Sequence, residues 1–227
     1  MLNKWPVCIR VWIWQRIFNM NNIAPKNRFI SCLKVALFFL CCTPLVVLVW
    51  RAYQNELGAN PVEMLIRNTG FWALNFLWFT LAITPLRRLT GWGSLMRFRR
   101  MLGLFVFFYA LVHGLMFIGL EHSFDPQAML EDVLKRPFVT MWFLALLLLF
   151  PLALTSSQVA IRKLGGVRWQ KLHRLVYLIG ILAGAHYWFL SKGTALLWPA
   201  GYGLVLALLL VFRIKFRASN RVSAARS

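Results

Sequence analysis

The sequence predicts an all-helical membrane protein, a bundle of six transmembrane helices with both termini in the cytoplasm. Two observations carry this prediction: 60% of the 227 residues are hydrophobic, and apolar runs close to a membrane-spanning length recur along the chain. An apolar helix needs about 20 residues to cross the hydrocarbon core of a bilayer. The expected spans are residues 30–50, 69–86, 101–120, 137–154, 172–190 and 194–212.

The distribution of charge sets the expected orientation of these spans. Of the 26 Lys and Arg residues, 21 lie in residues 1–34, 87–100, 155–174 and 213–226, whereas all six Asp and Glu residues lie in the alternate loops. Lys and Arg accumulate on the cytoplasmic side of short loops. The net charge of +20 is therefore interpreted as a consequence of topology, and no nucleic-acid partner is expected.

The spans leave too little chain for a separate soluble domain, so one membrane domain is expected over residues 29–215. Residues 1–28 mix Trp and Ile with Arg and lack the clean apolar core and cleavage site of a signal peptide. They are expected to form an N-terminal basic amphipathic extension on membrane lipid, and residues 216–227 a basic cytoplasmic tail. The cysteines form no CxxC pair and are interpreted as small apolar residues of a helix. They are Cys8, Cys32, Cys41 and Cys42.

Three histidines fall inside the predicted spans. His113 lies in the second half of the third span, while His173 begins the fifth span and His186 lies near its far end. With the N-terminus inside, both spans run outward, so His113 and His186 are expected at nearly one depth, with His173 about 20 Å away at the cytoplasmic edge. Two neutral imidazoles at one depth suit the axial positions of a heme iron.

Other roles stay open for these histidines. A histidine in a membrane helix is costly and usually functional, and it can serve a proton relay, an ion site or a plain interhelical hydrogen bond. No Asp or Glu lies within a predicted span, which disfavours a relay, and zinc requires three or four close ligands. The glycines nearby either leave room for a macrocycle or let helices pack closely. They are Gly103, Gly114, Gly180 and Gly184.

Two further points concern the histidines. The separation of His173 and His186 along the chain corresponds to a rotation of about 220° on an ideal helix, so they share a face only if the fifth helix is bent or rewound near Gly180 and Gly184. His122, in the stretch EHSFDP after the third span, is expected to be a solvated loop residue.

The histidines and several longer stretches resemble the ferric-reductase-like transmembrane domain family. The stretches are WQKLHRLVYL around His173, RFRRMLGLFVFFYALVH ending at His113, ITPLRR, LTSSQ and LGANPVEMLIRNTG. In combination they are similar to one branch of that family, the heme-binding membrane subunits of bacterial periplasmic methionine-sulfoxide reductase systems. The resemblance covers about residues 30–215.

The resemblance implies a multi-pass b-type cytochrome of the bacterial inner membrane, with His113, His173 and His186 as its heme-associated histidines. Such a subunit passes electrons to a periplasmic molybdopterin-containing methionine-sulfoxide reductase, which holds the substrate-reducing site. The resemblance implies a donor that is either the quinone pool or a cytoplasmic NAD(P)H-dependent flavin reductase, and it associates FMN with the family. The chain has no Gly-rich dinucleotide loop, so the reductant is expected to come from elsewhere.

The number of hemes, one or two, depends on the cytoplasmic edge. Related oxidases use two histidine pairs for two stacked hemes, but Arg100 stands where that pattern has a histidine, as far before His113 as His173 stands before His186. Arg100 is expected either to reach the interface beside Arg97 and Arg99, or to face His173 and pair with a heme propionate or a flavin phosphate. Other side chains at this edge either hold a quinone-like or anionic group, or are present only because Lys and Arg accumulate on the cytoplasmic side. They are Gln158, Arg162, Arg168, Trp169 and Lys171.

A function of a different class stays open beside electron transfer. The chain could instead be a membrane transporter or an assembly scaffold whose histidines are structural. A reduced-minus-oxidised visible spectrum separates the two classes, because only a b-type cytochrome gives heme bands.

Overall fold

The computed structural model describes the backbone of residues 25–191 and 196–224 and the side chains of residues 28–191 and 196–212. Every regular element in these ranges is a helix, which confirms the predicted all-helical class. The predicted extension, residues 1–28, lies outside the described residues up to residue 24. The chain divides into two compact units, Met1–Tyr53 and Gln54–Ser227.

The described part of the first unit is one long helix, α2 (Pro25–Tyr53). Its apolar side chains are widely exposed; Phe39, for example, is 61% exposed. Such an all-round apolar surface suits contact with lipid tails better than contact with water. The described cysteines of this unit lie within α2 and form no disulfide with one another, in line with their interpretation as small apolar residues. They are Cys32, Cys41 and Cys42.

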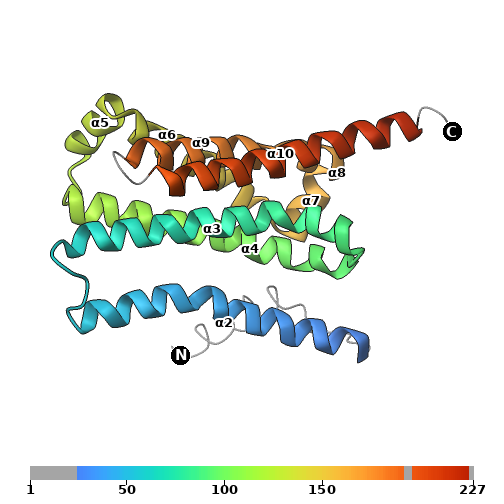
Figure 1. Cartoon of the computed structure of the whole chain (residues 1–227), viewed down its shortest axis with the longest axis horizontal. Coiled ribbons are helices and arrows are strands. Elements are labelled where there is room, and N and C mark those ends of the chain that lie inside the picture. The colour runs from blue at the N-terminus through green and yellow to red at the C-terminus, as the bar shows by residue number, and fades with distance from the viewer. Residues whose placement is uncertain (1–24, 192–195, 225–227) are drawn as a thin grey trace, which may run out of the picture. The chain divides into compact units, whose positions relative to one another are not determined.

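The second unit is a bundle in which α3, α4, α6, α9 and α10 run side by side (Figure 1). Its elements are α3 (Pro61–Thr90), η1 (Gly93–Leu95), α4 (Met96–Met116), η2 (Phe117–Glu121, a π-helical turn), α5 (Pro126–Lys135), α6 (Pro137–Leu154), α7 (Gln158–Leu164), α8 (Gly166–Leu172), α9 (Leu175–Leu190) and α10 (Leu197–Ala224). The described part of each predicted apolar run is mainly helical, and α6 has the predicted bounds.

Local sequence signals begin and end these helices. Asn60 caps α3 by accepting a hydrogen bond from the Glu63 amide at 3.2 Å, and Pro61 occupies the first helical position, where no amide hydrogen is needed. Asp125 and Pro126 begin α5 in the same way. Gly91 ends α3 with a φ of 70°, a left-handed conformation that glycine adopts without strain.

Aromatic side chains hold the centre of the bundle together. The ring of Phe76 in α3 lies 5.1 Å from Tyr109 and 5.8 Å from Phe105, both in α4. On the other side of α3, the Tyr202 hydroxyl of α10 donates a hydrogen bond to Asn75 at 2.9 Å. Aromatic contacts of this kind add to the burial of apolar area, so α3 is anchored on two sides.

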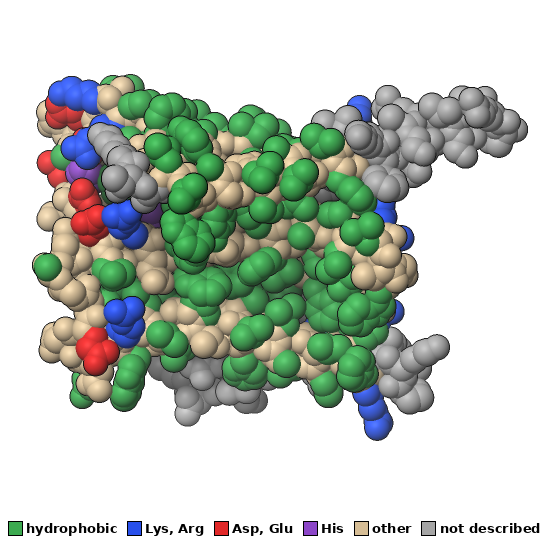
Figure 2. All heavy atoms as spheres, viewed as in Figure 1, with side chains coloured by type: hydrophobic (Ala, Val, Ile, Leu, Met, Phe, Trp, Pro, Cys, Tyr) green, Lys and Arg blue, Asp and Glu red, His purple; other side chains and the backbone are tan. Residues whose placement is uncertain are grey.

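The two ends of the second unit differ in charge. One end, hereafter the acidic end, comprises the loop 54–60, η2 and α5, and Figure 2 shows acidic side chains gathered there. The other end, hereafter the basic end, comprises residues 87–100 and the two short helices α7 and α8. Between the ends the surface is mostly apolar (Figure 2). This pattern is typical of a protein that crosses a bilayer.

Fewer described helices meet the length and hydropathy expected of a membrane span than the six that the sequence predicted. In the described part of the chain, four helical stretches are long and apolar enough to cross a membrane: Arg28–Tyr53, Pro61–Thr90, Gly93–Glu121 and Pro137–Leu154. The sequence predicted six, but α9 has 16 residues, about 24 Å at 1.5 Å per residue. The apolar part of α10, Leu197–Phe212, is also shorter. The chain is a multi-pass membrane protein with these four candidate spans.

Candidate functional site

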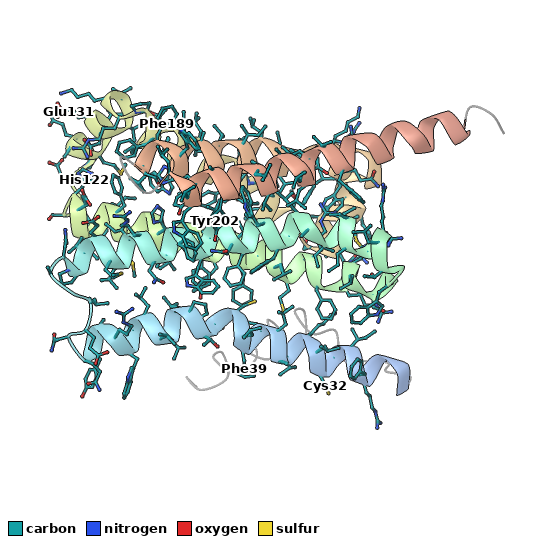
Figure 3. The ribbon with its side chains drawn as sticks, in the orientation of Figure 1. Cys32, Phe39, His122, Glu131, Phe189 and Tyr202 are labelled. Carbon is teal, nitrogen blue, oxygen red and sulfur yellow. The ribbon has the colours of Figure 1, made fainter. Side chains whose placement is uncertain are left out.

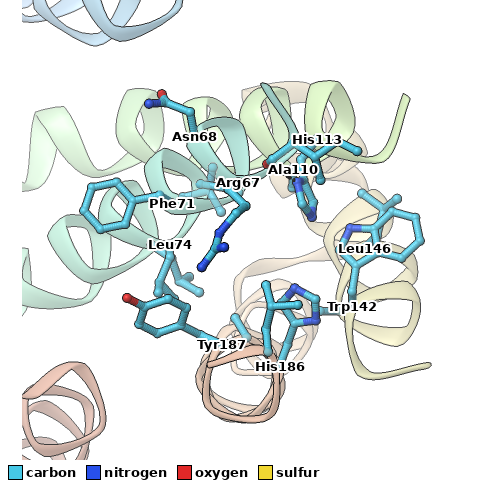
Figure 4. A pocket seen from close by; sticks show the side chains of 18 of the residues that line it. Arg67, Asn68, Phe71, Leu74, Ala110, His113, Trp142, Leu146, His186 and Tyr187 are labelled. Carbon is cyan, nitrogen blue, oxygen red and sulfur yellow. Dashed lines mark hydrogen bonds between the residues drawn. The ribbon is translucent and has the colours of Figure 1, made fainter. Parts of the chain in front are cut away.

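Two histidine rings face each other toward the acidic end of the second unit. His113 belongs to α4 and His186 to α9, and their ring centroids lie 6.2 Å apart with the ring planes at 73°. Figure 4 shows both rings at the wall of one cavity. The structure thus brings together the two histidines that the sequence placed at one depth, and their role as ligands stays a prediction.

A backbone carbonyl of a neighbouring helix holds each ring. His113 Nδ1 lies 2.8 Å from the Ile66 carbonyl oxygen of α3, and His186 Nδ1 lies 2.8 Å from the Phe138 carbonyl oxygen of α6. A carbonyl only accepts hydrogen bonds, so Nδ1 is the protonated nitrogen of each neutral ring and Nε2 keeps its lone pair. Proteins fix metal-binding imidazoles in this tautomer through such contacts.

The glycine that makes room for His113 is Gly70. A Cβ at Gly70 would lie 2.9 Å from Cε1 and 3.0 Å from Nδ1 of the His113 ring, closer than real Cβ atoms approach. Ile66 and Gly70 are one helical turn apart and therefore lie on one face of α3. One turn of α3 thus both binds the ring and gives it space, and sequence reasoning had not singled out either residue.

Trp142 of α6 closes another side of the His113 ring. The two rings meet edge to face with centroids 6.0 Å apart. The indole fits there because Gly114 has no side chain: a Cβ at Gly114 would lie 2.7 Å from Trp142 Cζ2. Gly114 therefore serves helix packing next to the site.

The other glycines in question are less crowded. A Cβ at Gly180 or Gly184 would lie 3.4 Å from Leu206 of α10, and one at Gly103 would lie 3.9 Å from the Thr80 methyl group, all within ordinary van der Waals contact. Gly180 and Gly184 sit in a continuous α9 without rewinding.

The cavity at the two rings has a volume of about 330 Å³. Its deep walls are apolar and come from four helices, for example Leu77, Val106, Leu149 and Ile179. Apart from the two histidines, its polar lining is on α3 and at the end of α9, toward the acidic end. These residues are Arg67, Asn68, Tyr187 and Ser191. An apolar cavity with a few polar groups at one end is typical of a cofactor site.

The donor set fits a heme better than a bare metal ion. Metal–imidazole bonds are about 2 Å long, so two rings on opposite sides of one ion have centroids about 6 Å apart, in agreement with the 6.2 Å between His113 and His186. Across the described residues, no three His, Cys, Asp or Glu side chains are placed to hold a metal ion. A porphyrin supplies the equatorial nitrogens itself and needs only axial protein ligands, which the two Nε2 atoms can provide.

His173 has different neighbours. It lies in the turn between α8 and α9, so the predicted continuous helix over 172–190 is interrupted at its start. Its ring stacks on Trp169 with centroids 4.0 Å apart, and its Nδ1 lies 3.2 Å from the Trp169 carbonyl oxygen. His173 is not among the residues that line the cavity.

Arg99 of α4 lies close enough to His173 for its positive charge to act on the ring. Arg99 is partly buried, whereas Arg97 and Arg100 are exposed. The sequence left two roles open for Arg100, reaching the interface beside Arg97 and Arg99 or facing His173 across a cofactor, and its role stays a prediction. The polar side chains proposed for the same edge, Gln158, Arg162, Arg168 and Lys171, are also exposed, and Trp169 donates a hydrogen bond from Nε1 to the Thr155 carbonyl oxygen at 2.8 Å.

The prediction that His122 is solvated was wrong. Its side chain is 11% exposed, and its Nε2 lies 3.3 Å from Asp132 of α5. Its ring also packs against Phe117 with centroids 4.6 Å apart. Figure 3 shows His122 at the acidic end, near α5 and Glu131. The residue is buried because α5, which the sequence analysis had treated as loop, folds over it.

Comparison with known proteins places these features in a family. The family of ferric reductase like transmembrane components matches residues 69–184, about half of the chain. That range includes His113 and His173 and ends just before His186.

Several curated relatives match most of their own length. A protein of Azospira oryzae is 50% identical over 190 residues, 84% of this chain and 82% of the relative. One of Herminiimonas arsenicoxydans is 47% identical over 213 residues, 92% of this chain and 98% of the relative. One of Rhodospirillum rubrum is 44% identical over 191 residues, 83% of this chain and 92% of the relative. Each of these relatives is named protein-methionine-sulfoxide reductase heme-binding subunit MsrQ. No solved structure matches the chain significantly.

Proposed function

We propose that this chain, which belongs to the family of ferric reductase like transmembrane components, is a heme-binding subunit that carries electrons through a membrane. Its relatives are named for heme binding and for a methionine-sulfoxide reductase. The observation that carries the proposal is the pair His113 and His186, whose rings lie 6.2 Å apart at one cavity.

The residues of the cavity have separate tasks in this proposal. The Nε2 atoms of His113 and His186 would bind the iron, while the carbonyls of Ile66 and Phe138 hold both imidazoles in the tautomer that this binding requires. Gly70 sets the plane of the His113 ring, and apolar walls keep water from the metal. A heme bound there supplies a one-electron carrier.

We further propose that the chain crosses the bacterial inner membrane six times, with the basic end and both termini in the cytoplasm. The charge difference between the ends supports this orientation. The histidine pair then lies toward the periplasmic side, where a molybdopterin-containing methionine-sulfoxide reductase would accept the electrons for repair of oxidised proteins.

The donor side lies at the basic end in this arrangement. His173, Trp169 and Arg99 form an interacting group there. Because α9 rises about 1.5 Å per residue, this group is too far from the histidine pair for direct contact. A quinol or a flavin reductase carrying FMN is the proposed donor, and a second heme at His173 is an alternative to a carrier bound from outside.

The proposal is tested by absorption spectroscopy of the full chain, expressed with ample heme and purified in detergent. The expected result is the low-spin spectrum of a b-type cytochrome, which His113→Ala and His186→Ala each abolish because each removes one axial ligand. His122→Ala is the matched control, since it removes a mostly buried histidine outside the cavity, and it should leave the spectrum unchanged.

Two outcomes would contradict the proposal. A low-spin spectrum that survives in both single variants would show that His113 and His186 are not the ligands. A wild-type protein without heme bands would favour the transporter or scaffold function with structural histidines.

A further inference from the structure

We infer that Arg67 is the residue that binds a carboxylate of the cofactor at the polar end of the cavity, and that it thereby fixes which edge of the macrocycle faces the acidic end. This inference rests on the proposed heme function. Figure 4 shows the Arg67 side chain extending from α3 toward the space between His186 and Tyr187 of α9.

The first argument is the distribution of polarity along the cavity. Arg67 and Leu77, both lining residues of α3, are separated by about 15 Å along the helix. The lining changes over this length from charged and polar to wholly apolar. A heme has two propionates on one edge of an otherwise apolar ring. Burying those carboxylates at the apolar end would leave charges unpaired in a low-dielectric environment, which is costly.

The second argument is charge. Among the described residues that line the cavity, Arg67 alone carries a permanent charge. The lining contains no carboxylate, and Glu63, the partner of Arg67, stands outside it. A planar guanidinium binds a carboxylate through two parallel hydrogen bonds, so the described lining offers one site matched to a propionate and offers it at the polar end.

The third argument is that Arg67 can hold both groups. Its Nη1 atom donates to Glu63 Oε1 at 2.8 Å, and a guanidinium has five N–H donors in a fixed fork. Glu63 is also tied to the helix cap, because Asn60 Nδ2 donates to its Oε2 at 3.2 Å. The exposed pair with Glu63 therefore uses only part of the guanidinium, and donors remain for a second carboxylate.

The experiment compares the rate at which heme leaves the purified full-length protein for excess apomyoglobin, together with the reduction midpoint of the bound heme. Arg67→Gln should lose heme roughly tenfold faster, the size expected for one charge-assisted contact, and its heme should become harder to reduce because a nearby positive charge is gone. Arg67→Lys should lie between Arg67→Gln and wild type, since an ammonium keeps the charge without the bidentate geometry.

Two control variants separate this role from a general charge or helix effect. Arg136→Gln also removes a cation from an i, i+4 ion pair, with Asp132, but outside the cavity lining. Glu63→Gln removes the partner of Arg67 and keeps the guanidinium. Both should stay within about twofold of wild type, as expected for exposed ion pairs.

Reconstitution with the dimethyl ester of heme gives the decisive comparison, because the ester has no carboxylate for Arg67 to bind. The difference between wild type and Arg67→Gln should vanish with the ester. A difference that persists with the ester, or Glu63→Gln behaving like Arg67→Gln, would overturn the inference while leaving the histidine ligands in place. Failure of wild type to bind heme would overturn the proposed function itself.

Discussion

At the residue scale, the His113 ring is held on several sides, and Gly70→Ala tests whether the space beside it is required. The new Cβ would lie 2.9 Å from the ring, and the ring cannot easily retreat because Ile66 and Trp142 hold its other sides. Overpacking of this kind costs about 1–3 kcal/mol. We expect a lower melting temperature, less heme per protein and an altered low-spin electron paramagnetic resonance signal.

Gly103→Ala is the matched control for Gly70→Ala. Both glycines lie in the interior of long helices, but a Cβ at Gly103 would meet only the Thr80 methyl group, at 3.9 Å. This substitution should be neutral or slightly stabilising, because alanine favours the helix. Equal heme content and equal resonance signals in the two variants would contradict the positioning role of Gly70.

The sequence could predict the depth of the two histidines but not what holds them. Depth follows from a fixed rise per residue, so counting along the third and fifth runs was enough to bring His113 and His186 together. The carbonyls of Ile66 and Phe138 that hold the rings could not be identified from the sequence, because every residue has a backbone carbonyl. Gly70 could be found only from the position of the His113 ring beside it.

At the element scale, the break between α8 and α9 means that the spacing of His173 and His186 does not describe one continuous helix. The sequence analysis singled out Arg100 because it precedes His113 by as many residues as His173 precedes His186. In the structure that separation includes a turn at His173 and Arg174, so it is not a spacing along one helix. Along the continuous α4, the helical rotation brings Arg99 within about 40° of the face of His113, whereas Arg100 lies about 140° away.

Arg99→Gln tests the role of the basic end of α4. Arg99 is partly buried beside His173, and the acidic residues of the chain all lie at or next to the acidic end. A guanidinium placed in this way is suited to hold an anionic or quinone-like electron donor. We expect quinol-driven reduction to slow about tenfold, as for the loss of one charged contact, with the low-spin spectrum of the histidine pair unchanged.

Arg97→Gln is the control for this experiment, because Arg97 lies on the same turn of α4 and is exposed. It should be reduced at the wild-type rate. Equal rates for Arg99→Gln and Arg97→Gln would show that both arginines only anchor the helix at the interface.

At the scale of the whole molecule, the charge pattern of the sequence predicted which loops lie together at each end of the second unit. The number of membrane crossings depends on the length of α9, which the sequence did not show. The acidic and basic ends follow from composition, since all the acidic residues fall in alternate loops. The sequence could not show that the fifth run divides into α8 and α9, because both pieces are helical and the division is one turn long. That division shortens the helix that carries His186.

The decisive measurement of topology is a set of reporter fusions around α9 and α10. Alkaline phosphatase is active only in the periplasm, whereas green fluorescent protein fluoresces when it stays in the cytoplasm and not when it has been exported unfolded. We expect fluorescence from fusions after Gly165 and at the C-terminus, and phosphatase activity from fusions within α5 and after Leu196.

The fusion after Leu196 carries the test, because it lies between α9 and α10 and reports directly whether α9 crosses. A helix of 16 residues falls about 6 Å short of a hydrocarbon core of about 30 Å. A bilayer can thin around it at a cost of fractions of a kcal/mol per Å. Fluorescence from this fusion would mean that α9 and α10 do not cross and that the chain has only four spans. His186 would then have to reach His113 from a helix that enters the bilayer without leaving it on the far side.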